Sequence, residues 1–207
     1  MRTRGSIRKI LLIFSFVLIL LGFWFSTSNA YTFIKGYMLF HTGQTKIVKS
    51  GEKPSKQHKE NLNKEPLYSI RPNKGENIGN LLIPKLNATL PIFHGTDEEE
   101  LEKGVGHFDK SVLPGEQDNS VLSGHRDTVF RKLGEVGKGD KLIVETSAGT
   151  FTYKIRHVRI VDKDDRTVIV PKPRATLTVS TCYPFNFIGA SPERYILVAD
   201  LISQKLT

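Results

Sequence analysis

The sequence predicts a mainly β domain, either a closed or nearly closed β-barrel or a β-sandwich, with one or two short helices and a preceding N-terminal transmembrane helix. Two observations lead to this fold class. From Tyr68 to the C-terminus, short runs rich in β-branched and aromatic residues are separated by Gly, Pro and Asn, as in proteins built from short strands. Before that, 25 consecutive residues from Ile10 to Ile34 carry no charge, which is long enough to span a bilayer core.

The N-terminal apolar stretch is predicted to be an uncleaved anchor. Four cations come first: Arg2, Arg4, Arg8 and Lys9. They keep the amino end in the cytoplasm, which gives a cytoplasmic stub over residues 1–9 and a transmembrane signal-anchor over residues 10–30. A cleaved signal peptide is the alternative, because Ser28-Asn29-Ala30 resembles a small-x-small cleavage site. The strongly apolar part has 16 residues, more than the ~7–15 of a signal peptide core, and this favours the anchor. Both alternatives place the rest of the chain outside the cytoplasm.

The basic charge of the chain belongs to its N-terminal part. Residues 1–66 carry 11 Lys or Arg against 3 Asp or Glu, whereas residues 67–207 carry 19 against 18. The nearly neutral domain over residues 67–207 therefore argues against a nucleic-acid partner. Between anchor and domain, residues 31–66 are predicted to form an extracytoplasmic helix followed by a lysine-rich tether.

Within the domain, seven strands are expected: Gly79–Ile83, Ala88–Phe93, Ser120–His125, Lys141–Glu145, Thr150–Val161, Thr176–Cys182 and Arg194–Ile202. Residues 146–149 are expected to form the hairpin turn that joins the fourth of these strands to the fifth. A short helix is predicted after Thr96, which is a candidate N-cap with Glu99 three residues later. Val129–Leu133 is expected to form a single helical turn.

Cys182 is the only cysteine in the chain, which excludes an internal disulfide framework and multi-cysteine zinc sites. It ends a predicted strand whose residues alternate in direction. Leu177, Val179 and Thr181 therefore face one way, towards a core, and Cys182 faces the other way, onto a more polar surface. Pro184 should stop this strand, because it has no N–H to donate to a ladder. A nucleophile is expected at such a place, although a buried, inert thiol is the alternative.

Two further candidates lie at predicted strand ends. His125 differs from the other five histidines because it ends the apolar strand that contains Val121 and Leu122, directly after Gly124. Arg194 opens the last strand, where its guanidinium can donate to a developing oxyanion or remain a surface charge.

These residues resemble the motifs of a known family. Thr178-Val-Ser-Thr-Cys182 is similar to the Thr-Leu-x-Thr-Cys signature of sortases, the membrane-anchored cysteine transpeptidases of Gram-positive surfaces, with Val179 in place of leucine. The resemblance covers roughly residues 77–202. It also includes three other segments: Gly104-Val-Gly-His-Phe108, Ser123-Gly-His-Arg-Asp127 and Ser191-Pro-Glu-Arg-Tyr195. The sequence Cys182-Tyr-Pro-Phe185 is most similar to class D.

The resemblance implies a sortase β-barrel and a role for each candidate. It implies that Cys182 is the nucleophile, His125 the acid/base and Arg194 the group that stabilises the carbonyl oxygen. Thr181 and Tyr183, which flank the nucleophile, are expected to shape the substrate groove. The implied partners are secreted proteins with a C-terminal Leu-Pro-x-Thr-Gly or Leu-Pro-x-Thr-Ala sorting signal, an amine of the peptidoglycan precursor, and membrane lipid around the N-terminal helix. Because the sequence contains no phosphate loop, HExxH or EF-hand pattern, no cofactor or metal is expected.

Two alternatives remain at this stage. One is a different cysteine peptidase or an L,D-transpeptidase acting on wall peptides, although the Ser-His-Gly-Cys pattern of the latter is absent. The other is a tethered, non-enzymatic wall-binding module in which Cys182 is buried.

Overall fold

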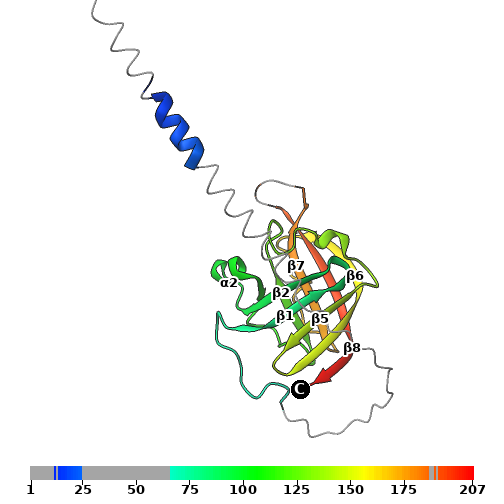
Figure 1. Cartoon of the computed structure of the whole chain (residues 1–207). Helices are drawn as coiled ribbons and strands as arrows, with labels where there is room; N and C mark the ends of the chain where they lie inside the picture. The colour runs from blue at the N-terminus through cyan, green and yellow to red at the C-terminus, as the bar shows by residue number, and fades with distance from the viewer. Residues whose placement is uncertain (1–11, 13, 25–65, 187–188, 190) are drawn as a thin grey trace, which may run out of the picture.

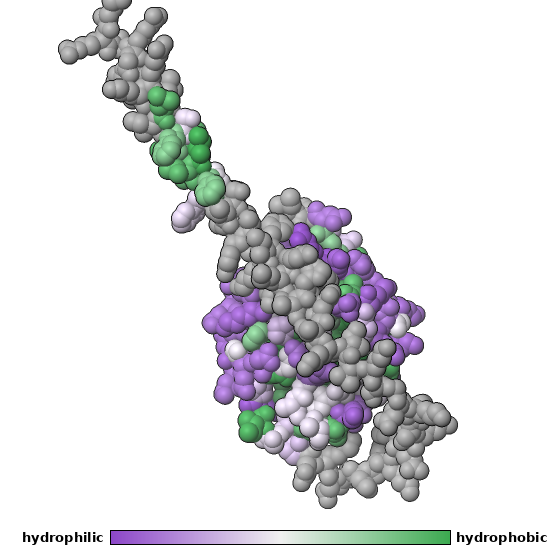
Figure 2. All heavy atoms as spheres, in the orientation of Figure 1, coloured by the Kyte–Doolittle hydropathy of each residue, from purple (hydrophilic) through white to green (hydrophobic). Residues whose placement is uncertain are grey.

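The structure is a computed structural model that describes residues 12, 14–24, 66–186, 189 and 191–207. Residues 14–24 are helical, and apolar side chains such as Phe14 and Trp24 are exposed along this helix (Figure 2). Within the described ranges, none of the helices has the length and apolarity needed to cross a membrane. The predicted stub over 1–9, most of the linker over 31–66 and the ends of the predicted anchor over 10–30 lie outside the described residues.

Eight strands close into a β-barrel in the order β1-β2-β3-β4-β7-β8-β6-β5 (Figure 1). Their bounds are β1 Asn77–Ile83, β2 Ala88–His94, β3 Val105–His107, β4 Asn119–Ser123, β5 Lys141–Thr146, β6 Gly149–Asp162, β7 Thr176–Tyr183 and β8 Glu193–Leu206. The helical elements are η1 Pro84–Leu86, α2 Glu98–Lys103 and η2 Leu133–Glu135. The predicted mainly β barrel with short helices is therefore confirmed.

Two of the strand pairs are parallel, and both need a crossover in the chain. Helix α2 connects β2 to the parallel β3, while η2, β5 and β6 lie between β4 and the parallel β7. All other neighbouring pairs are antiparallel. The β4–β7 pairing places the ends of two strands that are distant in sequence side by side.

The core fills the inside of the barrel with alternate residues of the strands. Leu81, Tyr153, Leu177, Val179 and Leu197 are all 0% exposed and belong to this one cluster. A second, smaller cluster lies where Val168, in the connection between β6 and β7, packs on Ile196 and Val198 of β8. This connection therefore covers part of the outer face of β8.

The predicted elements differ from the observed ones mainly at their ends. The seven predicted strands all exist, and the turn at 146–149 joins β5 to β6 as expected. The three-residue β3 is an eighth strand that the sequence analysis missed, because its central Gly106 gives no strand pattern. The N-cap of α2 is Asp97, paired with Glu100 in a capping box, and not Thr96 with Glu99. The single turn expected at 129–133 is displaced to η2.

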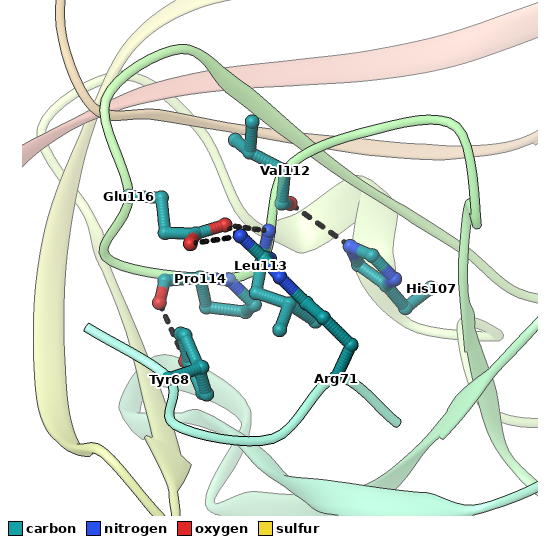
Figure 3. Close-up of polar contacts among 7 residues, drawn as sticks. All are labelled: Tyr68, Arg71, His107, Val112, Leu113, Pro114 and Glu116. Carbon is teal, nitrogen blue, oxygen red and sulfur yellow. Dashed lines mark hydrogen bonds and ion pairs between the residues drawn. The ribbon is translucent and has the colours of Figure 1, made fainter. Parts of the chain in front are cut away.

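The segment over residues 68–71, which we call the strap, precedes β1 and packs against the connection between β3 and β4 (Figure 3). The Tyr68 hydroxyl donates to the carbonyl oxygen of Pro114 at 2.6 Å. Both Nη atoms of Arg71 bond the carboxylate of Glu116, at 2.7 and 2.8 Å, and this carboxylate also accepts from the backbone N–H of Leu113. The start of the domain is thus tied to the barrel by side chains rather than by strand pairing.

Candidate active site

Cys182 is the penultimate residue of β7 and lies on its outer face. Leu177, Val179 and Thr181 are buried on the inner face of the strand, as the alternation predicted, while the Cys182 side chain is partly exposed as a free thiol. The strand ends at Tyr183, directly before Pro184. The thiol is therefore at the edge of the barrel, in contact with solvent, and not sealed in the core.

His125 is placed beside Cys182 by the parallel pairing of β4 and β7. In this register Ser123 lies opposite Ser180, so His125 and Cys182 each follow a paired residue by two positions. The N–H of Gly124 donates to the carbonyl oxygen of Ser180 at 3.3 Å, which extends the pairing one step towards the two residues. The His125 side chain is 36% exposed. The observed strand ends two residues before His125, whereas it was predicted to end at it.

Gly124 provides space for the histidine. A Cβ atom at this position would lie 2.7 Å from Phe130 and 2.8 Å from Val129. These distances are below those of real Cβ contacts, so a side chain here would displace Val129 and Phe130. The glycine next to the histidine, noted in the sequence, is thus required by packing.

Arg194 is the residue directly opposite Cys182 in the antiparallel pair of β7 and β8. Residues opposite each other in such a pair point to the same face, with Cβ atoms ~4.5–5.5 Å apart. Nη1 of Arg194 donates to the carbonyl oxygens of Ser191 at 3.1 Å and of Glu193 at 2.9 Å. Among the described residues, the guanidinium of Arg194 thus makes both of its hydrogen bonds through Nη1. The two backbone carbonyl oxygens fix its orientation.

Glu98 is a fourth charged residue at this site, which the sequence analysis missed. Its Oε1 lies 3.2 Å from Nε2 of His125, and its side chain is largely exposed. The carboxylate belongs to the first turn of α2, so it is in position to pair with a protonated imidazole. The acidic run at 97–100 was interpreted only as a helix start, and no local pattern connects it to a histidine that is 27 residues away.

The two residues expected to shape the groove lie on the inner side of β7. Thr181 is 3% exposed, and its hydroxyl donates to the carbonyl oxygen of Gly124 at 2.8 Å, which links the strand that carries Cys182 to the residue before His125. The rings of Tyr183, Phe185 and Tyr195 form a cluster of three, in which the Tyr183 centroid lies 5.8 Å from that of Phe185 and 6.3 Å from that of Tyr195. Their contact with substrate stays a prediction.

A family profile for the sortase domain matches residues 81–202, which include all three of the candidate catalytic residues. The chain belongs to the sortase family. It is similar to sortase D of Bacillus subtilis (strain 168), with 52% identity over 130 residues that cover 62% of this chain and 66% of that protein. It is also similar to sortase A of Bacillus anthracis, with 24% identity over 64% of this chain and 63% of that protein. The match thus spans somewhat less than two thirds of the length of these sortases.

Solved sortase structures share the fold of this sortase. The sortase D5 transpeptidase of Clostridium perfringens superimposes with a TM-score of 0.58 and 29% identity, over 63% of this chain and 82% of that chain. The SrtA sortase of Actinomyces oris gives a TM-score of 0.61 and 27% identity, over 66% and 86% of the two chains. Within the part of this sortase that the structure describes, His, Cys, Asp and Glu side chains do not gather in groups of three that would hold a metal ion.

Proposed function

We propose that this sortase is a membrane-anchored cysteine transpeptidase that cleaves a Leu-Pro-x-Thr-Gly or Leu-Pro-x-Thr-Ala sorting signal after threonine and joins the new carboxyl end to a cell-wall amine. The observation that carries the proposal is the register of β7 with its two neighbours. The partly exposed thiol of Cys182 lies opposite Arg194 of β8, whose guanidinium is held by backbone carbonyl oxygens. It also lies at the same level as His125, which follows β4. A nucleophile, an acid/base and an oxyanion donor are the three groups that acyl transfer needs.

In the first half of the reaction, the Cys182 thiolate attacks the carbonyl carbon of the substrate threonine. The guanidinium of Arg194 donates to the oxygen as it gains negative charge. The bond from the threonine carbonyl to the next residue's nitrogen breaks, and protonated His125 gives its proton to the leaving amine. A thioester between Cys182 and threonine remains.

In the second half, an amine of the wall precursor attacks the thioester carbonyl. The carbon–sulfur bond breaks, Cys182 leaves as a thiolate, and His125 takes the proton that the amine loses. Oε1 of Glu98 lies 3.2 Å from Nε2 of His125, so its carboxylate pairs with the protonated imidazole. This protonated form donates in the first half of the reaction and is formed again in the second. The product is an amide, and both catalytic groups return to their starting protonation states.

Membrane anchoring through residues 10–30 is part of the proposal. It is supported by the leading cations, the 25-residue uncharged run and the exposed apolar side chains of the helix over residues 14–24. An anchor would keep the enzyme, the hydrophobic tail of its protein substrate and the lipid-linked precursor at one surface, which raises their effective concentration. Alkali-resistant sedimentation of the full chain with membranes, compared with a chain that lacks residues 1–30, tests this part alone.

The experiment that tests the reaction uses the full chain in detergent with Leu-Pro-x-Thr-Gly and Leu-Pro-x-Thr-Ala peptides and an amine acceptor. We expect cleavage after threonine and an acyl adduct on Cys182 by mass spectrometry. Cys182→Ala and His125→Ala should abolish turnover. His157→Ala, at an exposed position in the middle of β6, is the matched control and should keep it. An enzyme that cleaves only wall stem peptides, or a thiol that stays unmodified, would refute the proposal.

A further inference from the structure

Arg126 is a buried cation beside the proposed catalytic residues. It follows His125 directly and is only 5% exposed, and a charge removed from water needs polar partners. Its Nε and Nη2 donate to the carboxylate of Asp127 at 3.0 and 3.2 Å. Its Nη1 donates to the carbonyl oxygen of Pro184 at 2.9 Å and to the hydroxyl of Ser191. One guanidinium therefore joins the end of β4 to both sides of the connection between β7 and β8.

Through Pro184 and Ser191, these contacts lead to two of the three candidate catalytic residues, Cys182 and Arg194. Pro184 is two residues after Cys182, so the bond to its carbonyl oxygen fixes the backbone where the nucleophile's strand ends. Ser191 accepts from Arg126 through its hydroxyl and from Nη1 of Arg194 through its carbonyl oxygen, at 3.1 Å. Ser191 is thus held between two guanidinium groups, and a shift of Arg126 is transmitted to Arg194.

We propose that Arg126 is a positioning residue of this enzyme, which holds Cys182 and Arg194 in their catalytic arrangement through Pro184 and Ser191. The inference rests on the proposed transpeptidase function, because it assigns Arg126 a role in placing that reaction's groups. It also gives a role to residues to which the catalytic assignments give none: Arg126 and Asp127 directly after His125, and Ser191.

The charge of Arg126 acts on the same site. The hydrogen bond to Asp127 raises the pKa of the Arg126 guanidinium, and the negative charge of a Cys182 thiolate raises it further. The positive charge of Arg126 therefore lies within electrostatic reach of the Cys182 sulfur. The other charged groups around this site are His125, which follows β4, Glu98 of α2, Arg194 of β8 and Asp127, whose carboxylate pairs with Arg126. Arg126 therefore combines two effects, geometry and charge, which different substitutions separate.

The test compares variants of the full chain. Arg126→Lys keeps the charge, but a lysine ammonium lacks the planar fork that bonds Asp127, Pro184 and Ser191 together. Arg126→Met removes both charge and bonds, and Ser191→Ala removes the link from the other side. The matched control is Arg71→Lys, which breaks an equally forked pair with Glu116 beside the start of β4, away from the thiol. The measurements are kcat and KM for the sorting peptide, the rate of Cys182 alkylation by iodoacetamide against pH, and far-UV circular dichroism for folding.

We expect Arg126→Lys to lower kcat up to about 100-fold, the loss that a displacement of a catalytic group by about 1 Å can cause. Its alkylation profile should match that of the wild type, whereas Arg126→Met should be alkylated more slowly near neutral pH, because the positive charge near the Cys182 sulfur is lost. Ser191→Ala should lower kcat, and adding it to Arg126→Lys should change little, because residues in one network are non-additive. Arg71→Lys should retain wild-type kcat and alkylation profile.

Wild-type kcat in folded Arg126→Lys, fully additive effects of Arg126 and Ser191, or an equal loss in Arg71→Lys would each overturn the inference. If Arg126→Met does not fold, Arg126→Lys and Ser191→Ala decide the question. If the wild-type chain cleaves neither peptide, the proposed function fails. The alkylation profile of Arg126→Met then still decides whether Arg126 acts on the thiol, and an unchanged rate near neutral pH would count against it.

Discussion

His107 should make the barrel lose stability in mild acid. The imidazole is 0% exposed, and its Nε2 lies 2.9 Å from the carbonyl oxygen of Val112, so Nε2 carries the proton and donates (Figure 3). Its Nδ1 then accepts from Nδ1 of His94, 3.0 Å away. A second proton on His107 would sit on Nδ1 and point at the N–H of His94. Two donors would then face each other in the protein interior.

Burial is the main reason that the pKa of His107 is lowered to about 4, with the charge of His94 as a smaller cause. In the unfolded chain a histidine has a pKa of about 6.5. Between these two values the unfolded state binds more protons than the folded state, so the free energy of unfolding falls as the pH falls through this window. The linkage gives a loss of about 2 kcal/mol by pH 5 and about 3 kcal/mol by pH 4, a large part of the usual stability of a domain.

The assay is urea unfolding of the wild type and of His107→Gln at pH 7, 6 and 5, followed by far-UV circular dichroism. Tryptophan fluorescence is unsuitable, because the only tryptophan, Trp24, lies in the N-terminal helix and not in the barrel. His107→Gln removes the titrating group, so any cost that it has at pH 7 should shrink by about 2 kcal/mol at pH 5. A constant difference between the two proteins, or an imidazole that titrates near its unfolded value by NMR, would refute the reasoning.

Three further outcomes are expected. Arg194→Lys should lower turnover nearly as far as Arg194→Ala, about 10²–10³-fold, because arginine bonds the two carbonyl oxygens through Nη1 and can face the substrate with Nε or Nη2, whereas lysine has a single nitrogen; near-normal kcat in Arg194→Lys would contradict this. Gly115→Ala should destabilise the barrel strongly in thermal unfolding, since Gly115 has φ +92° and a Cβ would lie 2.2 Å from Phe151; an unchanged melting temperature would show that the ring moves freely. Tyr68→Phe should cost about 1 kcal/mol in urea unfolding, because it removes the buried bond to Pro114 while keeping the ring; no change would mean that the strap adds nothing to stability.

Much of the fold and most of the site were predictable because their signals are local. The alternation of Leu177, Val179 and Thr181 against Cys182 placed the thiol on the outer face of β7, and Pro184 marked the end of that strand. Short elements were less predictable. Strand β3 has three residues, too few for a repeating pattern. At the start of α2, Thr96 with Glu99 and Asp97 with Glu100 have the same spacing, so the sequence pattern did not distinguish the two caps.

The tertiary structure decided which charged groups act together. Glu98 meets His125, and Arg126 meets Pro184 and Ser191, only because closure of the barrel brings α2 and the β7–β8 connection to the end of β4. The spacing of these residues along the sequence does not predict such contacts.

The sequence by itself determined seven of the eight strands, the faces of their residues and the three catalytic candidates, since side-chain alternation and turn chemistry depend on near neighbours. Only the closed barrel decided the register that sets Arg194 opposite Cys182 and His125 beside it. Pairing between distant strands is fixed by the packing of the whole core, because a shift of one residue would turn every side chain of β7 to the opposite face.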